Sequence, residues 1–162
     1  MRESGNFTKY LEVLDAINQR GATTGFLSSD PLEFTFFAPT DDAYTTLEIE
    51  RLQIPIEQAL QIPVLAELIE ESGRRQVTYG QWDSTVLANA NGQLSLTSIN
   101  EDQLFVSTAA ADVTVAEKSS ATLWDIPVVI TVSDGINYAT TVSIEEGFCG
   151  GGVVYVIDRV LF

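Results

Sequence analysis

Phe34–Tyr44, with the sequence FTFFAPTDDAY, is the stretch that decides the fold. Its first half is an apolar run suited to a β-strand, and Pro39 stops that run. Thr40 is placed to cap a helix, because its hydroxyl can accept a hydrogen bond from a free backbone N–H group of the first turn. Asp41 and Asp42 lie in that turn, where the helix dipole favours negative charge. The stretch therefore predicts a buried strand, a sharp turn and a capped helix in direct succession.

A second apolar block spans Val153–Leu161, with the sequence VVYVIDRVL. Its β-branched residues follow one another almost without interruption, as expected of a strand buried on both faces. Alternation places Asp158 on the opposite side of this strand from Ile157 and Arg159. Because an unpaired buried carboxylate is costly, we expect Asp158 to accept hydrogen bonds from backbone or hydroxyl groups.

Together the two segments resemble the signature segments of the fasciclin-like domain family, whose members are adhesion and interaction modules. The resemblance extends from Phe7 to Leu161. It implies an α+β fold, a β-wedge or sandwich with a helical N-terminal half packed on it, and it places the strands Phe34–Ala38 and Val153–Val160 in one core. It implies a structural role for the residues that match the family motifs, which are Thr35, Phe37, Ala38, Pro39, Thr40, Asp41, Val156, Ile157, Asp158 and Val160.

The first half of the chain is predicted to be mainly helical. An apolar stripe indicates a packing helix before Gly21, with Asn6 favoured as its cap over a role as a glycosylation acceptor. A short helix is expected from Asp41 to about Leu47. Pro55 and Pro63 are each expected to begin another short helix, and Gly73 is expected to end the last one. The positions predicted to face the core are Phe7, Tyr10, Leu11, Leu14, Ile17, Ala43, Tyr44, Leu47, Ile56, Ala59, Leu60, Leu65, Leu68 and Ile69.

The second half is predicted to form a sheet. Asn91-Gly92 and Asp134-Gly135 are hairpin signals, because both dipeptides accept the positive φ of tight turns. Helices followed by strands, with one early strand, argue for an α+β layer over a doubly wound fold. The expected strands in this half are Val77–Tyr79, Thr85–Leu87, Leu94–Thr97, Leu104–Ser107, Val113–Val115, Val128–Val132, Tyr138–Val142 and Val153–Val160.

Length and composition indicate one globular domain over residues 1–162, of which 45% are hydrophobic. No apolar run approaches the ~20 residues of a membrane helix, so we expect no membrane insertion. The net charge of −15 repels phosphate backbones, which disfavours nucleic acid as a partner. The opening residues lack the apolar core of a signal peptide, and the single cysteine cannot form an internal disulfide. The residues themselves therefore indicate no compartment.

Two regions depart from the family pattern. The family's Tyr-His pair has no counterpart in Arg75–Gly80, since the chain contains no histidine, and its Asp-Ile pair is replaced by Ser143-Ile144. Both elements are proposed to bind integrins in the family, so integrin binding is not expected here.

Residues 100–127 are predicted to be an insertion relative to the family. They carry more apolar material than a solvated loop needs, including Leu104, Phe105, Val113, Val115 and Trp124. We favour an extra hairpin folded onto the domain's own core. The alternative is a partner surface, for which Phe105 and Trp124 are the candidates.

Catalytic chemistry is not indicated. The usual nucleophile–base pairs need a histidine, and Cys149 has acidic rather than cationic neighbours in sequence. The glycine run 150–152 precedes a strand rather than a helix, unlike a phosphate loop, and no calcium-loop pattern is present, so no cofactor or metal is expected. The adjacent acidic pairs are expected to be solvated or capping charges: Asp41-Asp42, Glu70-Glu71, Glu101-Asp102 and Glu145-Glu146.

The sequence thus predicts a non-enzymatic protein-interaction or cell-adhesion-type module, with another protein or a matrix glycan as its partner. The alternative is an accessory structural subunit of a larger complex, for example in an organelle lumen. The resemblance implies a secreted or cell-surface location, with an organelle or periplasmic lumen as the alternative.

Overall fold

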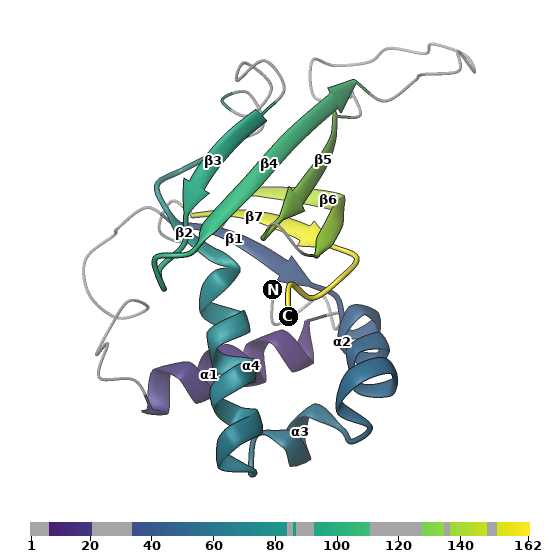
Figure 1. Ribbon diagram of the computed structural model, residues 1–162. Coiled ribbons are helices and arrows are strands. Elements are labelled where there is room, and N and C mark those ends of the chain that lie inside the picture. Colours follow the sequence, from purple (N-terminus) through teal and green to yellow (C-terminus); the bar gives the residue numbers. More distant parts are fainter. Residues whose placement is uncertain are drawn as a thin grey trace.

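The computed structural model describes residues 7–20, 34–83, 86, 93–110, 128–134, 137–148 and 152–162. Helices occupy one side of the molecule and strands the other (Figure 1). The helices come first along the chain and the strands later, with one early strand, as the sequence predicts. The elements are α1 (Thr8–Arg20), β1 (Phe34–Pro39), α2 (Asp41–Leu47), a π-helical turn (Glu48–Leu52), α3 (Ile56–Ala59), α4 (Pro63–Arg75), β2 (Val77–Tyr79), β3 (Gln93–Thr97), β4 (Gln103–Ala110), β5 (Val128–Ser133), β6 (Tyr138–Phe148) and β7 (Gly152–Ile157).

The turn after β1 forms as its residues predict. Thr40 has extended backbone, and its side chain accepts a hydrogen bond from the backbone N–H of Ala43, 3.2 Å away. Asp41 and Asp42 lie in the first turn of α2. Thr40 is therefore the N-cap of α2, and this prediction is confirmed.

Two predictions about α4 are wrong. Gly73 does not end the helix, which continues to Arg75; it is buried inside the helix where α4 crosses α1. Leu68 does not face the core but is 45% exposed. Apart from Ile69, the buried residues of α4 are small or polar, namely Ala66, Glu70, Ser72 and Gly73. Small residues face α1 because the two helices lie close together.

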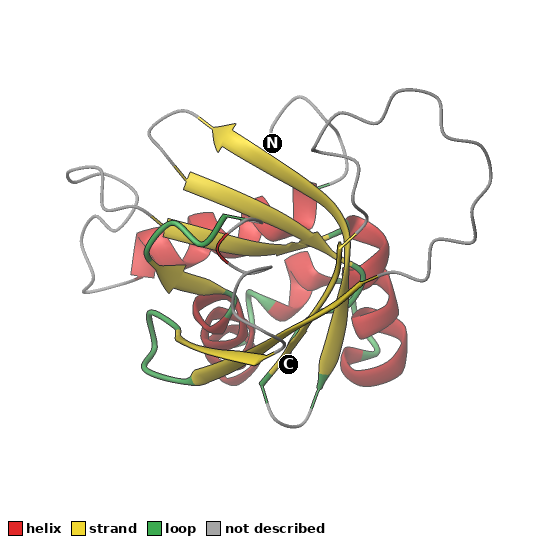
Figure 2. Cartoon of the chain, turned by 90° about the horizontal axis from the view of Figure 1, so that it is seen from above, coloured by secondary structure: helices red, strands yellow, loops and turns green. Residues whose placement is uncertain are grey.

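The seven described strands form one strongly curved sheet with the order β2-β1-β7-β6-β5-β4-β3. β1 and β7 pair in parallel, with Phe37 opposite Tyr155, and the other neighbours are antiparallel. The two outermost strands, β2 and β3, approach each other. Thr78 of β2 forms an isolated bridge with Ser98, which directly follows β3, and the N–H of Ile99 donates to the carbonyl of Val77. Seen from above, the strands curve around one another instead of lying in a flat layer (Figure 2).

β7 is buried on both faces, as its sequence predicts. Val154 and Val156 pack with the helices in one core. Tyr155 and Ile157 point into a second core inside the curved sheet, where the Tyr155 ring stacks on that of Phe37 with centroids 5.5 Å apart. The predicted common core of the two signature strands is confirmed.

Three strand predictions need correction. β7 ends at Ile157, so Asp158 lies just beyond the strand and is exposed; its Oδ1 still accepts a hydrogen bond from the N–H of Thr140, 2.7 Å away. Val86 is helical, with its N–H held by Asp83, so no strand passes through it. β6 continues past the predicted end at Val142 to Phe148, so Glu145 and Glu146 lie in the strand and pair with β7.

Asp134 follows β5 directly and Tyr138 opens the antiparallel β6, in agreement with the second hairpin signal. Other predictions lie outside the described residues. They are the cap at Asn6, the stop at Gly21, the turn at Asn91-Gly92, the strand Val113–Val115, Trp124 and Cys149. No helix in the described ranges combines the length and the apolarity needed to cross a membrane.

Candidate interaction surface

The outer face of the sheet carries two exposed aromatic side chains in one row. Ser95, Phe105, Ser133 and Tyr138 lie directly opposite one another on β3, β4, β5 and β6. Residues paired in this way share one face of a sheet. Phe105 is 51% exposed and Tyr138 is 63% exposed, whereas Ser133 between them is buried. We call the surface formed by this row the aromatic face.

The alternation of β4 separates core from surface. Leu104 and Val106 are buried in the second core, while Phe105 points outward. Within β4, Leu104 therefore fits the interpretation of residues 100–127 as a hairpin packed on the core, and Phe105 fits the alternative of a partner surface. A role of Phe105 in binding remains a prediction, and Trp124, Val113 and Val115 lie outside the described residues.

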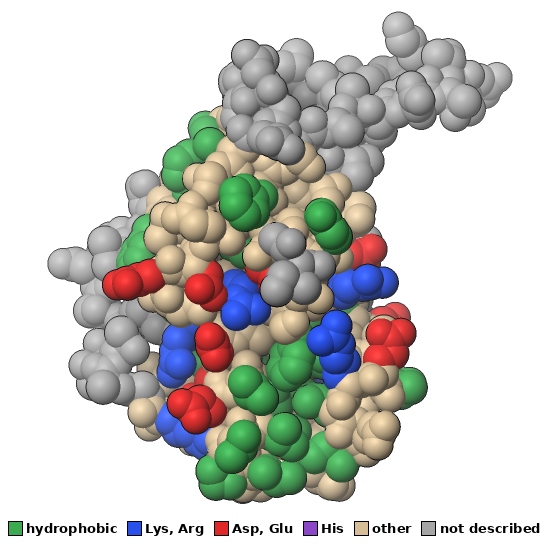
Figure 3. All heavy atoms as spheres, viewed as in Figure 1, with side chains coloured by type: hydrophobic (Ala, Val, Ile, Leu, Met, Phe, Trp, Pro, Cys, Tyr) green, Lys and Arg blue, Asp and Glu red, His purple; other side chains and the backbone are tan. Residues whose placement is uncertain are grey.

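Except at its lower edge, where charged side chains adjoin Phe105, the surroundings of the aromatic face are polar and uncharged. Thr97 and Gln103 are exposed, and Ser107, Thr131 and Thr140 are half-buried. The space-filling view shows this side over β4 and β5 as mostly uncharged polar or backbone atoms with isolated hydrophobic side chains, above a band of mixed charges (Figure 3). Such a mixture of exposed rings and hydroxyl groups is typical of a contact surface rather than of a core.

A network around Arg75 supports the lower edge of the face. The Nε of Arg75 donates to Asp102 at 2.8 Å, and its Nη1 donates to Asp134 at 3.2 Å. These three residues, with Gln103 and Phe105, line an open recess of about 200 Å³. Burial lowers the pKa of Arg75, but its hydrogen bond to Asp102 and the charges of Asp102, Asp134 and Glu71 raise that pKa overall. The guanidinium therefore stays charged and holds the end of α4 to two turns of the sheet.

The second turn is fixed further by Asn137. Its N–H donates to Asp134 at 2.7 Å, and its side-chain amide donates to the carbonyl of Phe162 at 2.9 Å. Tyr138 follows directly, so the ring at the edge of the aromatic face is next to a residue that is hydrogen-bonded on both sides. Sequence reasoning missed Tyr138, although its place after the Asp134-Gly135 signal and before the buried Ala139 predicts an outward side chain.

The family-motif residues pack or hydrogen-bond within the scaffold. Thr35 donates its hydroxyl to the carbonyl of Gly80 at 2.8 Å and accepts from the N–H of Trp82 at 2.9 Å. Asp41 accepts from the N–H of Lys9, and the N–H of Thr40 donates to Ile157. The remaining motif residues, apart from Asp158 described above, are buried: Phe37, Ala38, Pro39, Val156, Ile157 and Val160.

Not every acidic pair is solvated. Glu70 is 5% exposed and lies between Arg20 and Arg74, at 3.2 and 3.6 Å. Arg74 is the i,i+4 neighbour of Glu70 on α4, but Arg20 is brought to Glu70 only by the packing of α1 on α4, so the sequence did not show that Glu70 is buried. Within the described ranges no group of three or more acidic or cysteine side chains is placed to hold a metal ion.

Comparison with known proteins supports the fold. No family model and no curated protein matches the sequence. A solved structure, a FAS1 domain pair from the insect cell adhesion molecule fasciclin I, matches with a TM-score of 0.59 and 21% identity. The match covers 98% of this chain and 46% of that chain, so this chain spans less than half of the domain pair. The chain has the FAS1 fold, and the predicted α+β fasciclin-like architecture is confirmed.

Proposed function

We propose that residues 1–162 form a single-domain, non-enzymatic interaction module that binds a partner protein through the aromatic face. The observation that carries the proposal is the row in which Phe105 and Tyr138 stand exposed on either side of Ser133. Aromatic side chains are enriched at the energetic centres of protein interfaces, because a ring removes a large apolar area from water with few rotatable bonds.

Charge and anchoring also support a protein partner. The chain carries a net charge of −15, yet the aromatic face itself is formed by uncharged side chains. Two partners can therefore meet there without bringing unpaired charges out of water. The face rests on paired strands and on the Arg75 network, so little ordering is needed on binding.

Adhesion is the form of this function that the fold favours. Fasciclin I, whose domain pair shares the fold, is a cell adhesion molecule. On that analogy we place this module outside the cell or on its surface, with a lumenal compartment as the alternative.

A second candidate function, an accessory subunit of a larger complex, is favoured by a different surface. Ile62, Val64 and Leu68 are 43%, 69% and 45% exposed near the start of α4. Hydrophobic side chains gather at this helical end of the molecule (Figure 3). An apolar patch of this kind would be covered in a permanent assembly.

Matched pairs of substitutions test the two functions. Cross-linking in native source material, followed by mass spectrometry and sizing, compares the parent with Phe105→Ser/Tyr138→Ser and with Val64→Ser/Leu68→Ser. If the aromatic face binds the partner, only the first pair loses the cross-linked species, by at least about fivefold per hot-spot ring. If the cross-linked species is instead a large complex that is lost only with Val64→Ser/Leu68→Ser, the protein is an accessory subunit of that complex.

A glycan array with the same variants addresses the remaining partner class. We expect no glycan whose capture depends on Phe105 and Tyr138. Capture of a matrix glycan that disappears with Phe105→Ser/Tyr138→Ser would assign the aromatic face to a glycan and contradict a protein partner.

A further inference from the structure

Some of the basic side chains of this acidic chain form ion pairs, and others do not. Six of its eight Lys and Arg residues lie in the described ranges. Four of the six are in ion pairs: Lys9 with Glu48, Arg20 and Arg74 with Glu70, and Arg75 with Asp102, Asp134 and Glu71. The other two, Arg51 and Arg159, have no ion pair with any described residue, and both are exposed.

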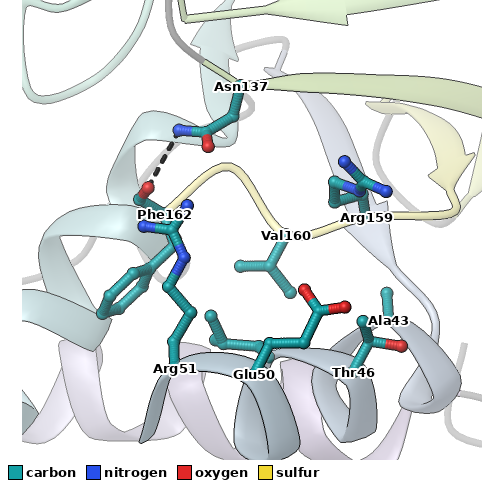
Figure 4. A pocket seen from close by; sticks show the side chains of 9 residues that line it. Ala43, Thr46, Glu50, Arg51, Asn137, Arg159, Val160 and Phe162 are labelled. Carbon is teal, nitrogen blue, oxygen red and sulfur yellow. Dashed lines mark hydrogen bonds between the residues drawn. The ribbon is translucent and has the colours of Figure 1, made fainter.

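The two unpaired arginines line the same recess. Arg51 comes from the π-helical turn after α2, and Arg159 comes from the segment after β7. Figure 4 shows them on either side of the recess, with Val160 and the carboxylate of Glu50 between them. The recess has a volume of about 60 Å³. That is several times the ~10–15 Å³ that a single water molecule needs by the same kind of measure, which leaves room for a group of carboxylate size.

The walls of the recess suit an anion on a short aliphatic stem. Val160 is buried and Phe162 is half-buried, so they provide an apolar lining beside the guanidinium groups. Asn137 holds the backbone of Phe162 in place through the 2.9 Å hydrogen bond to its carbonyl. A guanidinium group offers two parallel N–H donors to a carboxylate, and two such groups facing one recess can share one anion.

We propose that this recess binds a carboxylate side chain of an acidic peptide segment in a partner protein. Two features favour a carboxylate over a phosphate. The stem of a Glu or Asp side chain can pack on Phe162, whereas free phosphate has no stem, and Glu50 repels a dianion more strongly than a monoanion. No residue of the aromatic row lines this recess, which comes nearest to the aromatic face at Asn137, and its occupation does not require the rings of Phe105 or Tyr138.

The test is an NMR titration of the side-chain Nε–H signals of the arginines. The probe is a blocked heptapeptide of alternating glycine and glutamate, and its control is the same peptide with glutamine. We expect the glutamate peptide, and not the glutamine peptide, to shift the signals of Arg51 and Arg159. Arg51→Gln and Arg159→Gln should each weaken binding roughly threefold, as expected of exposed ion pairs.

Charge-matched variants separate the recess from general attraction. Glu50→Gln should strengthen binding roughly threefold, while Glu57→Gln, the same change at an exposed position on α3, should leave it almost unchanged. Arg20→Gln provides the matched control for the arginines, since Arg20 is paired with Glu70 on another side of the fold.

Three results would overturn the proposal. They are equal shifts with the glutamine peptide, an Arg20→Gln effect as large as that of Arg51→Gln, and displacement of the glutamate peptide by inorganic phosphate at lower concentration. We expect Phe105→Ser/Tyr138→Ser to bind the glutamate peptide as the parent does, which would show that binding at this recess is independent of binding through the aromatic face.

Discussion

Gly73 of α4 lies directly against Val13 of α1. A Cβ atom built on Gly73 would be only 2.7 Å from Cγ1 of Val13 and 2.8 Å from Cδ1 of Ile17. Both side chains are buried, and the β-branched Val13 has little freedom to turn away. The absence of a side chain at position 73 is therefore what allows the two helices to pack at this distance.

Gly73→Ala should destabilise the protein, although alanine is the better helix former by about 1 kcal/mol. Overpacking a tight core costs about 1–3 kcal/mol, so we expect a net loss of about 1 kcal/mol in the free energy of unfolding. Chemical denaturation measures it. The control is Val13→Ala/Gly73→Ala, which should lose less than the sum of the two single changes because the contact is relieved. Strict additivity, or a stabilised Gly73→Ala, would contradict the close packing.

Thr40→Ala should cost about 1 kcal/mol of stability, because it removes the side chain that accepts a hydrogen bond from Ala43. Binding through the aromatic face, measured per folded molecule, should stay unchanged. Thr46→Ala is a suitable control: its hydroxyl donates to the carbonyl of Asp42 on an exposed side of the same helix, and its loss should cost less than about 0.5 kcal/mol. Lost binding at parental stability would instead make Thr40 part of the binding site.

Tyr10→Phe should stabilise the protein at neutral pH. The hydroxyl of Tyr10 is buried and has no hydrogen-bond partner among the described residues. Leaving such a group unsatisfied costs about 1 kcal/mol or more, which phenylalanine avoids. Thermal or denaturant unfolding at pH 7 should therefore show a more stable variant, and a less stable one would indicate that the hydroxyl is satisfied.

Because its hydroxyl is buried, Tyr10 should also make the protein less stable at alkaline pH. Burial raises the pKa of Tyr10 and of Tyr44 above the ordinary tyrosine value of about 10. Above pH ~10 the unfolded chain releases these protons while the folded chain keeps them, so the unfolded state binds fewer protons and stability falls as pH rises. The fall should be shallower in Tyr10→Phe, by up to about 1.4 kcal/mol per pH unit. Identical slopes from pH 9.5 to 11.5 would show that Tyr10 does not contribute.

Leu104 and Phe105 are neighbours in β4 with opposite environments. Leu104→Ala should cost about 2–5 kcal/mol, because it empties part of the second core. Phe105→Ala should cost much less, about 0.5 kcal/mol, because about half of that side chain is already in water. Denaturant unfolding of both variants is the measurement. Similar losses would mean that both faces of β4 are core, and the aromatic face would not be available to a partner.

The sequence by itself determined the features that depend on near neighbours in the chain. The strand, proline and cap around Thr40 arise from contacts between residues a few positions apart, and the uninterrupted apolar run of β7 is enough to indicate burial on both faces. The apolar pattern and the two signature blocks were enough to predict the α+β fold and the shared core of β1 and β7. Local rules succeeded here because propensity, capping and burial agree within each segment.

Only the tertiary structure decided what depends on partners far away in the chain. Gly73 looked like a helix stop, but α1 uses it as a close-packing site, and Glu70 looked solvated until Arg20 reached it from another helix. Phe105 and Tyr138 share a row because of the register across β4, β5 and β6, and Arg51 and Arg159 share a recess across more than a hundred residues. Strand register and helix crossings are set by the summed packing of the whole core, so no local pattern around these residues contains the information.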